Sequence, residues 1–226
     1  EVDIASEFRY RNPIIDEKTL CIFISQSGET ADTIAALKLS KSKGAKTLAV
    51  SNVIGSSITR EADYTIYTHA GPEIAVASTK AYTSQVVLLG ILAIYFAEIL
   101  ESTDSETLEN LKKDIFDLPK KIETSLKASD EVKKFAKKIS KEKDVFFIGR
   151  GSDYNVALEG SLKLKEISYI HSESYAAGEL KHGTISLVTD QMPVISVATQ
   201  SELLEKMVSN IVEVKSRDAF TITVTK

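Results

Sequence analysis

Short apolar segments rich in β-branched residues alternate along the chain with longer segments whose apolar residues recur at helical spacing. The short segments have the length of single strands and are apolar almost throughout, as in strands buried on both faces. This pattern predicts an α/β protein with parallel sheets flanked by helices. The expected strands are Leu20–Ile24, Thr47–Val50, Tyr64–Tyr67, Val145–Ile148, Val194–Ala198 and Phe220–Val224.

The segments between the strands are expected to form helices, among them Thr30–Lys43, Ser78–Leu100 and Tyr154–Ser168. The longest apolar stretch, Val86–Ala97, is shorter than the roughly 20 residues that cross a bilayer. We therefore expect a buried helix there and no membrane association.

A polar, lysine-rich stretch between Glu101 and Lys143 separates two similar halves. Its apolar residues from Leu108 to Leu118 are spaced for one helix face, and Pro119 is expected to end that helix. The run of lysines from Lys133 to Lys138 is expected to be the solvated face of another helix. The predicted divisions are a first unit 1–110, a helical linker 111–142 and a second unit 143–226.

The two halves have the same strand, turn and helix pattern but are out of phase, which suggests a diverged repeat. If so, the first unit lacks an N-terminal strand and helix, and the second unit lacks its C-terminal part. A complete but asymmetric protein is the alternative.

Composition narrows the class of protein. The chain has 226 residues with a net charge of -4, so nothing general favours binding to nucleic acid. The single cysteine, Cys21, and the absence of a signal-like start favour the cytoplasm. No group of Cys, His and carboxylate residues has metal-site spacing, and no cofactor is expected.

The segment Ser25-Gln26-Ser27-Gly28-Glu29-Thr30 follows an expected strand and opens an expected helix. The N-terminus of a helix presents unpaired N–H groups and a positive dipole, so it can bind phosphate without Lys or Arg. Three hydroxyls and a glycine in six residues favour an anion site over a simple helix cap.

Lys163 and Glu166 are three residues apart in an expected helix, with Glu159 one turn earlier. On spacing alone, these residues form an exposed ladder of ion pairs. A positioned carboxylate can also move a proton between adjacent sugar carbons, and an imidazole such as that of His182 is suited to opening a sugar ring. His69 and His171 are interpreted as structural.

Four long blocks resemble the sugar isomerase (SIS) domains, in particular those of glucosamine-6-phosphate synthases. They are ISQSGETADTIAALKL from Ile24, SNVIGSSITREAD from Ser51, EIAVASTKAYTSQ from Glu73 and ALEGSLKLKEISYIHSESYAAGELKHG from Ala157. The resemblance covers nearly the whole chain and implies two SIS units, each a flavodoxin-like three-layer fold. Ala75 and Thr184 depart from the family, which usually has glycine and proline there.

The resemblance also implies a function. Ser25, Gln26, Ser27 and Thr30 would hold the phosphate of fructose 6-phosphate, and Val76 and Ser78 would contact the sugar. Glu166 would be the isomerase base, Lys163 would assist it, and His182 would open the sugar ring in a neighbouring subunit of a homodimer. A glutaminase domain of the same full-length chain would supply ammonia, and glucosamine 6-phosphate would be the product.

Two other functions stay open at this stage. A fructosamine-6-phosphate deglycase of the same family could share both the serine turn and the glutamate. A phosphosugar-sensing module would need the serine turn but has no chemical need for Glu166 and His182 together.

Overall fold

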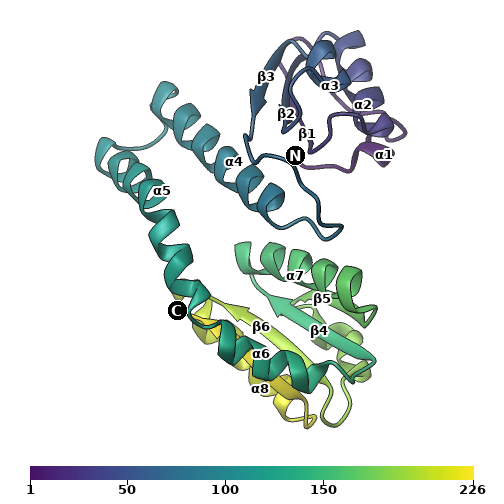
Figure 1. Ribbon diagram of the computed structural model, residues 1–226, viewed down its shortest axis with the longest axis vertical. Coiled ribbons are helices and arrows are strands. Elements are labelled where there is room, and N and C mark those ends of the chain that lie inside the picture. The colour runs from purple at the N-terminus through teal and green to yellow at the C-terminus, as the bar shows by residue number, and fades with distance from the viewer. The chain divides into compact units, whose positions relative to one another are not determined.

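The structure, a computed structural model, describes all residues from 1 to 226 and consists of two compact units, Glu1–Leu118 and Pro119–Lys226 (Figure 1). Each unit has its own sheet, and every strand pair in both sheets is parallel. The predicted α/β class is therefore confirmed.

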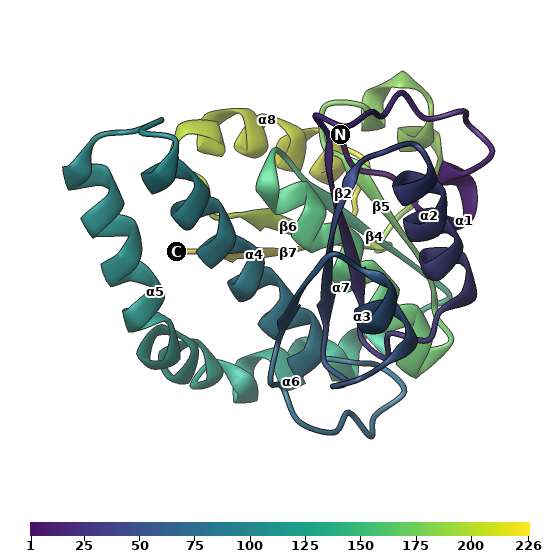
Figure 2. The same cartoon turned by 90° about the horizontal axis from the view of Figure 1, so that it is seen from above.

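Unit 1 contains a three-stranded sheet in the order β1 (Leu20–Ser25), β2 (Lys46–Ser51), β3 (Tyr64–Tyr67). Helix α2 (Ala31–Ser42) covers one face, where its Leu37 is fully buried, and α4 (Lys80–Ile99) covers the other (Figure 2). Two short helices, α1 (Ala5–Phe8) and α3 (Ser57–Glu61), complete the unit. All three strands agree with the predicted ones within a residue at each end.

Helix α4 corrects one prediction, because it is not a buried helix in this chain. Leu88, Leu92 and Phe96 pack on the β2–β3 side of the sheet, whereas Val86 and Tyr95 are about half exposed, at 51% and 53%. By length and composition alone α4 could cross a membrane, but its inner face lies on the sheet. Unit 1 therefore buries only part of the apolar surface of α4.

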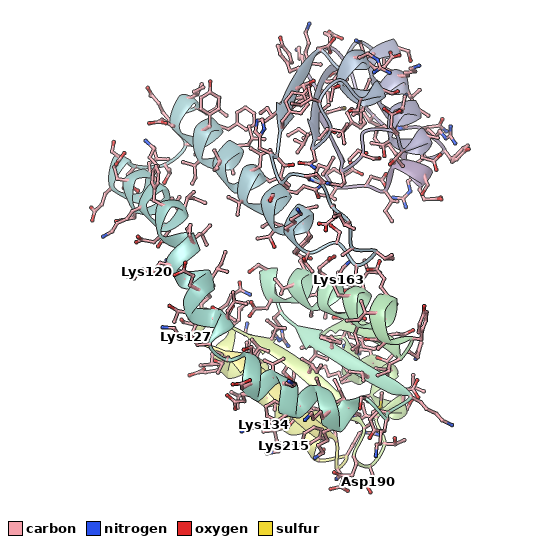
Figure 3. The ribbon with its side chains drawn as sticks, in the orientation of Figure 1. Lys120, Lys127, Lys134, Lys163, Asp190 and Lys215 are labelled. Carbon is pink, nitrogen blue, oxygen red and sulfur yellow. The ribbon has the colours of Figure 1, made fainter.

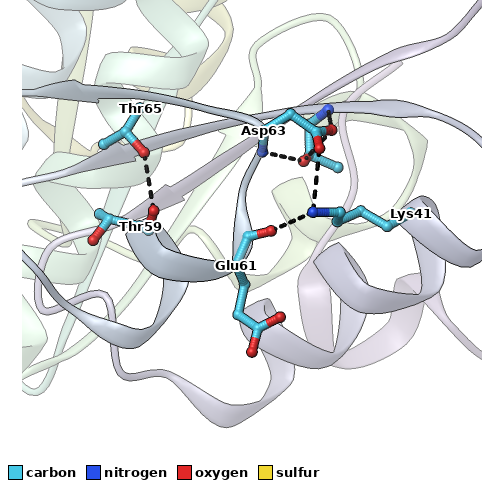
Figure 4. A network of polar contacts seen from close by, with 6 residues as sticks. Lys41, Thr59, Glu61, Asp63 and Thr65 are labelled. Atoms are coloured by element: carbon cyan, nitrogen blue, oxygen red, sulfur yellow. Dashed lines mark hydrogen bonds and ion pairs between the residues drawn. The ribbon is translucent and has the colours of Figure 1, made fainter.

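A polar network joins α2 to the start of β2 and β3 (Figure 4). The carboxylate of Asp63 accepts hydrogen bonds from the backbone N–H and the hydroxyl of Thr47, both at 2.9 Å. Lys41 of α2 forms an ion pair with Asp63 at 3.2 Å and donates to the carbonyl of Glu61 at 2.6 Å. Hydrogen bonds from Thr47 and then Lys41 lower the pKa of Asp63. This network fixes the amino end of the sheet, opposite the serine turn.

Unit 2 contains a four-stranded sheet in the order β5 (His171–Ala176), β4 (Asp144–Gly149), β6 (Pro193–Ala198), β7 (Phe220–Thr225). Helix α7 (Ser152–Ser168) packs with Val145 and Phe147 on one face. On the other face, α8 (Leu204–Lys215) and the short helical turns Leu180–His182 and Thr184–Leu187 pack with Phe146 and Ile148. A third short turn, Ser201–Leu203, precedes α8.

Strand β5 was not predicted. Its sequence HSESYA is mostly polar, and its neighbours on β4 supply the apolar contacts instead. Ser172 is buried, but its hydroxyl donates to Ser161 of α7 at 2.9 Å, so burial leaves no unpaired polar group there. An apolar pattern search cannot find a strand of this kind.

The region between the units corrects a second prediction, because Pro119 does not end its helix. Helix α5 (Ser105–Leu126) continues through Pro119, and α6 (Ser129–Ile139) follows it. A proline removes one backbone hydrogen bond from a helix but can be accommodated with a local kink. The lysines of α6 are exposed as predicted, and Figure 3 shows Lys134 among them. The unit limits at 110 and 142 stay a prediction.

The close approach of α7 to the end of β4 requires glycine at position 149. A Cβ there would lie 2.6 Å from the backbone of Asp153 and Tyr154 in the first turn of α7. We expect Gly149→Ala to lower the free energy of unfolding by about 1–3 kcal/mol or more, measured by urea denaturation, because backbone atoms must move.

Gly90→Ala is the matched control, because Gly90 lies inside α4 and its added Cβ would meet nothing closer than Ile115 at 3.8 Å. Alanine is the better helix former, so this variant should gain about 0.5–1 kcal/mol. Equal stability of the two variants would contradict the proposed packing of α7 on β4.

Candidate functional site

The serine turn of unit 1 connects the carboxyl end of β1 to the first turn of α2. Thr30 is the N-cap residue of α2, yet no side chain caps this helix. The Ser25 hydroxyl accepts a hydrogen bond from the N–H of Gly28 at 3.0 Å, and the Ser27 hydroxyl accepts one from Glu29 at 3.2 Å. Each serine can still donate its own proton. The turn therefore presents hydroxyl donors beside an uncapped helix N-terminus, as an anion site requires.

Gly28 holds this turn against the segment that follows β2. Its φ is +69°, and an added Cβ would lie 2.6 Å from the Cβ of Ser56. Its carbonyl accepts from the N–H of Ile58 at 2.9 Å. Glu29 accepts from the N–H of Ser57 at 2.8 Å, and hydrogen bonds from Ser57 lower the pKa of Glu29. The turn after β1 and the turn after β2 are therefore hydrogen-bonded to each other, which fixes the position of the serine hydroxyls.

Gln26 contributes an acceptor to the same turn. Its backbone carbonyl accepts from the N–H of Asn52 at 3.2 Å, which fixes the residue in place. The side-chain Oε1 atom is buried and has no hydrogen-bond partner. A buried amide oxygen without a donor is costly, so a donor from a bound molecule would be favourable here.

The predicted sugar contacts Val76 and Ser78 lie on the segment that leads from β3 into α4. Val76 is 95% exposed. The hydroxyl of Ser78 donates to Glu73 at 3.1 Å, and the same carboxylate accepts from the N–H of Ala81 at 3.3 Å. Glu73 therefore satisfies the N-terminus of α4 and already engages Ser78. A role for Val76 and Ser78 in sugar binding stays a prediction.

In unit 2, α7 presents Glu159, Lys163 and Glu166 on one face, as their spacing predicts, and Figure 3 labels Lys163 on this helix. The ammonium of Lys163 lies 2.6 Å from Glu166 and 3.5 Å from Glu159. All three side chains are partly shielded, with exposed fractions of 23%, 31% and 22%. The hydrogen bond that Lys163 donates to Glu166 raises the pKa of Lys163, and the negative charge of Glu159 adds to this effect. The pair is a preformed cation and carboxylate rather than two independent surface charges.

His182 ends a short helical turn that follows β5, and it is exposed. Leu180, in the same turn, is 1% exposed and anchors it in the core. Gly183 follows with a φ of +155°, and Thr184 donates to the carbonyl of Leu180 at 3.4 Å. The departure from the family at Thr184 is thus compatible with an ordered turn.

The other histidines have structural surroundings. His171 lies at the start of β5 and hydrogen-bonds to Asp144 at 2.7 Å. His69 packs beside the ring of Tyr67, with centroids 6.1 Å apart.

The carboxyl end of the unit 2 sheet has polar residues that were not predicted. Arg150 follows β4 and donates from Nε to Asn210 at 3.0 Å, and its guanidinium lies where a side chain at Gly178 would be. Asp153, only 4% exposed, accepts hydrogen bonds from Thr199 and Gln200. The segment Gly149-Arg150-Gly151-Ser152 was the available signal, a glycine-rich turn between a strand and a helix.

The sequence profile of the SIS domain matches residues 1–95 and 138–226, more than half of the chain. The chain belongs to the SIS domain family. This confirms the predicted resemblance, and the two parallel sheets agree with two SIS-type units.

The relatives that the chain matches are enzymes longer than the chain itself. The chain is 60% identical over 219 residues to the glutamine–fructose-6-phosphate aminotransferase (isomerizing) of Clostridium perfringens, and 63% identical over 219 residues to that of Clostridium tetani. These matches cover 97% of this chain, which spans 36% of each relative's length.

A solved structure extends the comparison. The C-terminal domain of glucosamine-fructose-6-phosphate aminotransferase from Francisella tularensis is 41% identical, with a TM-score of 0.97. That match covers 100% of this chain and 64% of the other. Fold and sequence therefore point to the same group of proteins.

The serine turn leads to a prediction about anion binding. Replacing Ser27 and Thr30 together by alanine should weaken phosphate binding to the chain, because hydrogen bonds to a charged group contribute about 1.5–3 kcal/mol each. Isothermal titration with inorganic phosphate measures the change.

The matched control replaces Ser42 and Thr83, whose hydroxyls donate to helix carbonyls of the same unit. This pair should leave the affinity unchanged. If both double variants bind phosphate like the parent, the serine turn is not the anion site.

Proposed function

We propose that this chain is the phosphosugar-isomerase part of a glutamine–fructose-6-phosphate aminotransferase, which forms glucosamine 6-phosphate from fructose 6-phosphate and glutamine-derived ammonia. Identity of about 60% over nearly the whole chain to enzymes of that name supports it. The observation that carries the proposal is the combination of an uncapped serine turn in unit 1 with the Lys163–Glu166 pair in unit 2.

Unit 1 supplies the binding part of this function. The phosphate of the sugar would accept hydrogen bonds from Ser25, Ser27, Thr30 and the first N–H groups of α2, and Gln26 would accept one from the ligand. The charge of the phosphate would be stabilised by the helix dipole without a lysine or arginine.

Unit 2 supplies the acid–base part. Isomerisation requires removal of a proton from one sugar carbon and its return to the neighbouring carbon, through an enediol-like intermediate. Glu166 would carry that proton. Lys163, whose ammonium lies 2.6 Å from the Glu166 carboxylate, would stabilise the negative charge that develops on the oxygen of the enediol. His182 is exposed and would open the sugar ring.

The proposal implies partners and a location. A glutaminase domain of the full-length protein would deliver ammonia, and His182 would act in the neighbouring subunit of a homodimer. Exposed apolar side chains on the segment before α4, Ile74 at 93% and Val76 at 95%, are compatible with a protein or ligand contact there. Cytoplasmic localisation agrees with the free Cys21.

The alternatives are separated by chemistry. A phosphosugar sensor would bind sugar phosphate but would not need the Lys163–Glu166 pair, which the structure holds ready on α7. A deglycase would use the same groups on an amino-acid-substituted sugar, so substrate choice distinguishes it from the proposed synthase.

Replacing Glu166 by glutamine tests the proposal. The full-length protein should form glucosamine 6-phosphate from fructose 6-phosphate and glutamine, and Glu166→Gln should lower that rate by about 100- to 10,000-fold while binding persists. Glu205→Gln, at an exposed position of α8, is the control and should keep the parent rate. If Glu166→Gln still exchanges the C1 or C2 proton with solvent at the parent rate, Glu166 is not the base.

A mixing experiment tests the role of His182. Variants that lack His182 or Glu166 should each be inactive, but a hybrid dimer should have about half of the parent activity, because one of its two sites is complete, and a fully exchanged equimolar mixture should have about a quarter. Activity of mixed full-length proteins measures the recovery. A hybrid shown by subunit exchange to have formed, yet inactive, would place His182 and Glu166 in the same subunit's site.

A further inference from the structure

The turn that follows β6 in unit 2 repeats the turn that follows β1 in unit 1. Each leads from a strand into a helix and then into a parallel neighbouring strand, β7 or β2. The sequences are also alike, with Thr199-Gln200-Ser201 in unit 2 and Ser25-Gln26-Ser27 in unit 1. The second turn therefore has the groups of an anion site: a hydroxyl and successive backbone N–H donors.

In unit 2 those donors already have an acceptor. One oxygen of Asp153 accepts from the hydroxyl of Thr199 at 2.6 Å. The other accepts from the N–H of Thr199 at 2.7 Å and from the N–H of Gln200 at 3.3 Å. Asp153 lies in the first turn of α7, the helix that follows β4. Because β4 pairs with β6, the Asp153 side chain lies beside the turn that follows β6. In unit 1 no carboxylate contacts the corresponding hydroxyl of Ser25, which hydrogen-bonds to Gly28 and Thr30 of its own turn.

We propose that the Asp153 carboxylate occupies the anion position of the second turn, so that this turn takes no phosphate and instead positions the first turn of α7. Helix α7 carries Glu159, Lys163 and Glu166. These residues lie 6 to 13 positions after Asp153, roughly 9 to 20 Å along the helix. The catalytic part of this proposal rests on the proposed function.

A second contact supports the same role. The side chain of Gln200 donates to the carbonyl of Arg150 at 2.7 Å, just before α7 begins. Gly151, which lies between Arg150 and the start of α7, has a φ of +55°, and a Cβ added there would lie 3.0 Å from the side chain of Gln200. The two turns of unit 2 are therefore joined at both the backbone and the Asp153 side chain, across about 50 residues of sequence.

The charge state of Asp153 agrees with this assignment. Burial raises its pKa, but the hydrogen bonds from Thr199 and Gln200 outweigh burial and hold the pKa below the ordinary value of 3.8. A carboxyl whose pKa is lowered on folding adds stability above its unfolded pKa and loses it as the pH falls through the folded value. The contact should therefore be intact at neutral pH and weaken only in acid.

Hydrogen exchange in the full-length protein tests the positioning role without any assay of activity. Asp153→Asn should speed exchange in the peptide 150–160 by about 10- to 100-fold at neutral pH, because charged hydrogen bonds are lost. Asp190→Asn, at an exposed carboxylate of the same unit, should leave that peptide unchanged. Parent-like exchange in Asp153→Asn would overturn the proposal.

Chemical rescue tests whether the position is an anion site. Asp153→Ala removes the carboxylate, and formate can restore it in the vacated space. Formate should recover the protection of peptide 150–160, whereas chloride at equal ionic strength should not. If neither formate nor chloride restores the protection, the turn after β6 is not an anion position and the first half of the proposal fails.

Kinetics test the link to catalysis. Asp153→Asn should lower kcat by about tenfold or more and change the KM for fructose 6-phosphate by less than about threefold, because displacement of α7 affects the acid–base groups and not the serine turn. Should Asp153 variants fail to fold, Thr199→Val and Thr199→Ser form a second pair. The serine variant should keep kcat and the valine variant should lose it.

The outcomes separate this proposal from the proposed function. If the parent protein forms no glucosamine 6-phosphate, the proposed function fails, yet the exchange and formate measurements still decide the role of Asp153. If the parent is active and Asp153→Asn keeps its kcat, only the positioning role fails.

Discussion

The N–H groups that open each helix after a parallel strand are the constraint on which the rest of this structure depends. Parallel strands place the following helix N-termini at one edge of the sheet, and each such end has donors that the helix itself cannot satisfy. In this chain Glu73 satisfies α4 and Asp153 satisfies the turn after β6. The turn before α2 has no such side chain. The start of α7 also lacks a side-chain cap, but the turn before α2 has in addition the hydroxyls of Ser25, Ser27 and Thr30, which favour an anion there.

The same constraint explains why glycine recurs at these turns. Gly28 and Gly149 stand where another strand-to-helix turn or the first turn of the following helix comes within van der Waals contact. Each position allows the backbone to come close enough for N–H groups to converge. Without that approach, the hydroxyls of Ser25 and Ser27 would be ordinary surface groups rather than part of a concave donor set.

Much of the fold could be predicted from the sequence because its strands are apolar and its helices are periodic. Six of the seven strands were found to within a residue or so at each end. Strand β5 was missed because its pairing with β4, and not its own composition, makes it a strand. Pro119 was misjudged because a proline removes only one backbone hydrogen bond, and α5 continues through it. Helix α4 was misjudged because apolar composition does not say which residues are covered.

The candidate residues show a similar division. The serine turn and the Lys163–Glu166 pair are local in sequence, so spacing predicts that their side chains lie together, whereas the role expected of the pair came from the family resemblance. The contact between Asp153 and Thr199 joins residues 46 apart, and only the pairing of β4 with β6 brings them together. No periodicity in the sequence contains that information. The functional roles of all these residues remain proposals drawn from geometry and resemblance.

The geometry of α7 also favours different roles for Lys163 and Glu166 in the proposed reaction. Hydrogen bonding to Glu166 raises the pKa of Lys163, so the lysine is a cation at neutral pH and cannot serve as the resting base. Glu166 lies 2.6 Å from that ammonium, so its proposed role as a base requires that Lys163 leave it. Glu159, 3.5 Å from the same ammonium, offers Lys163 an alternative partner. Under the proposed function, Lys163 would stay paired with Glu159 while Glu166 takes the proton, which would keep a positive charge near the developing enediol.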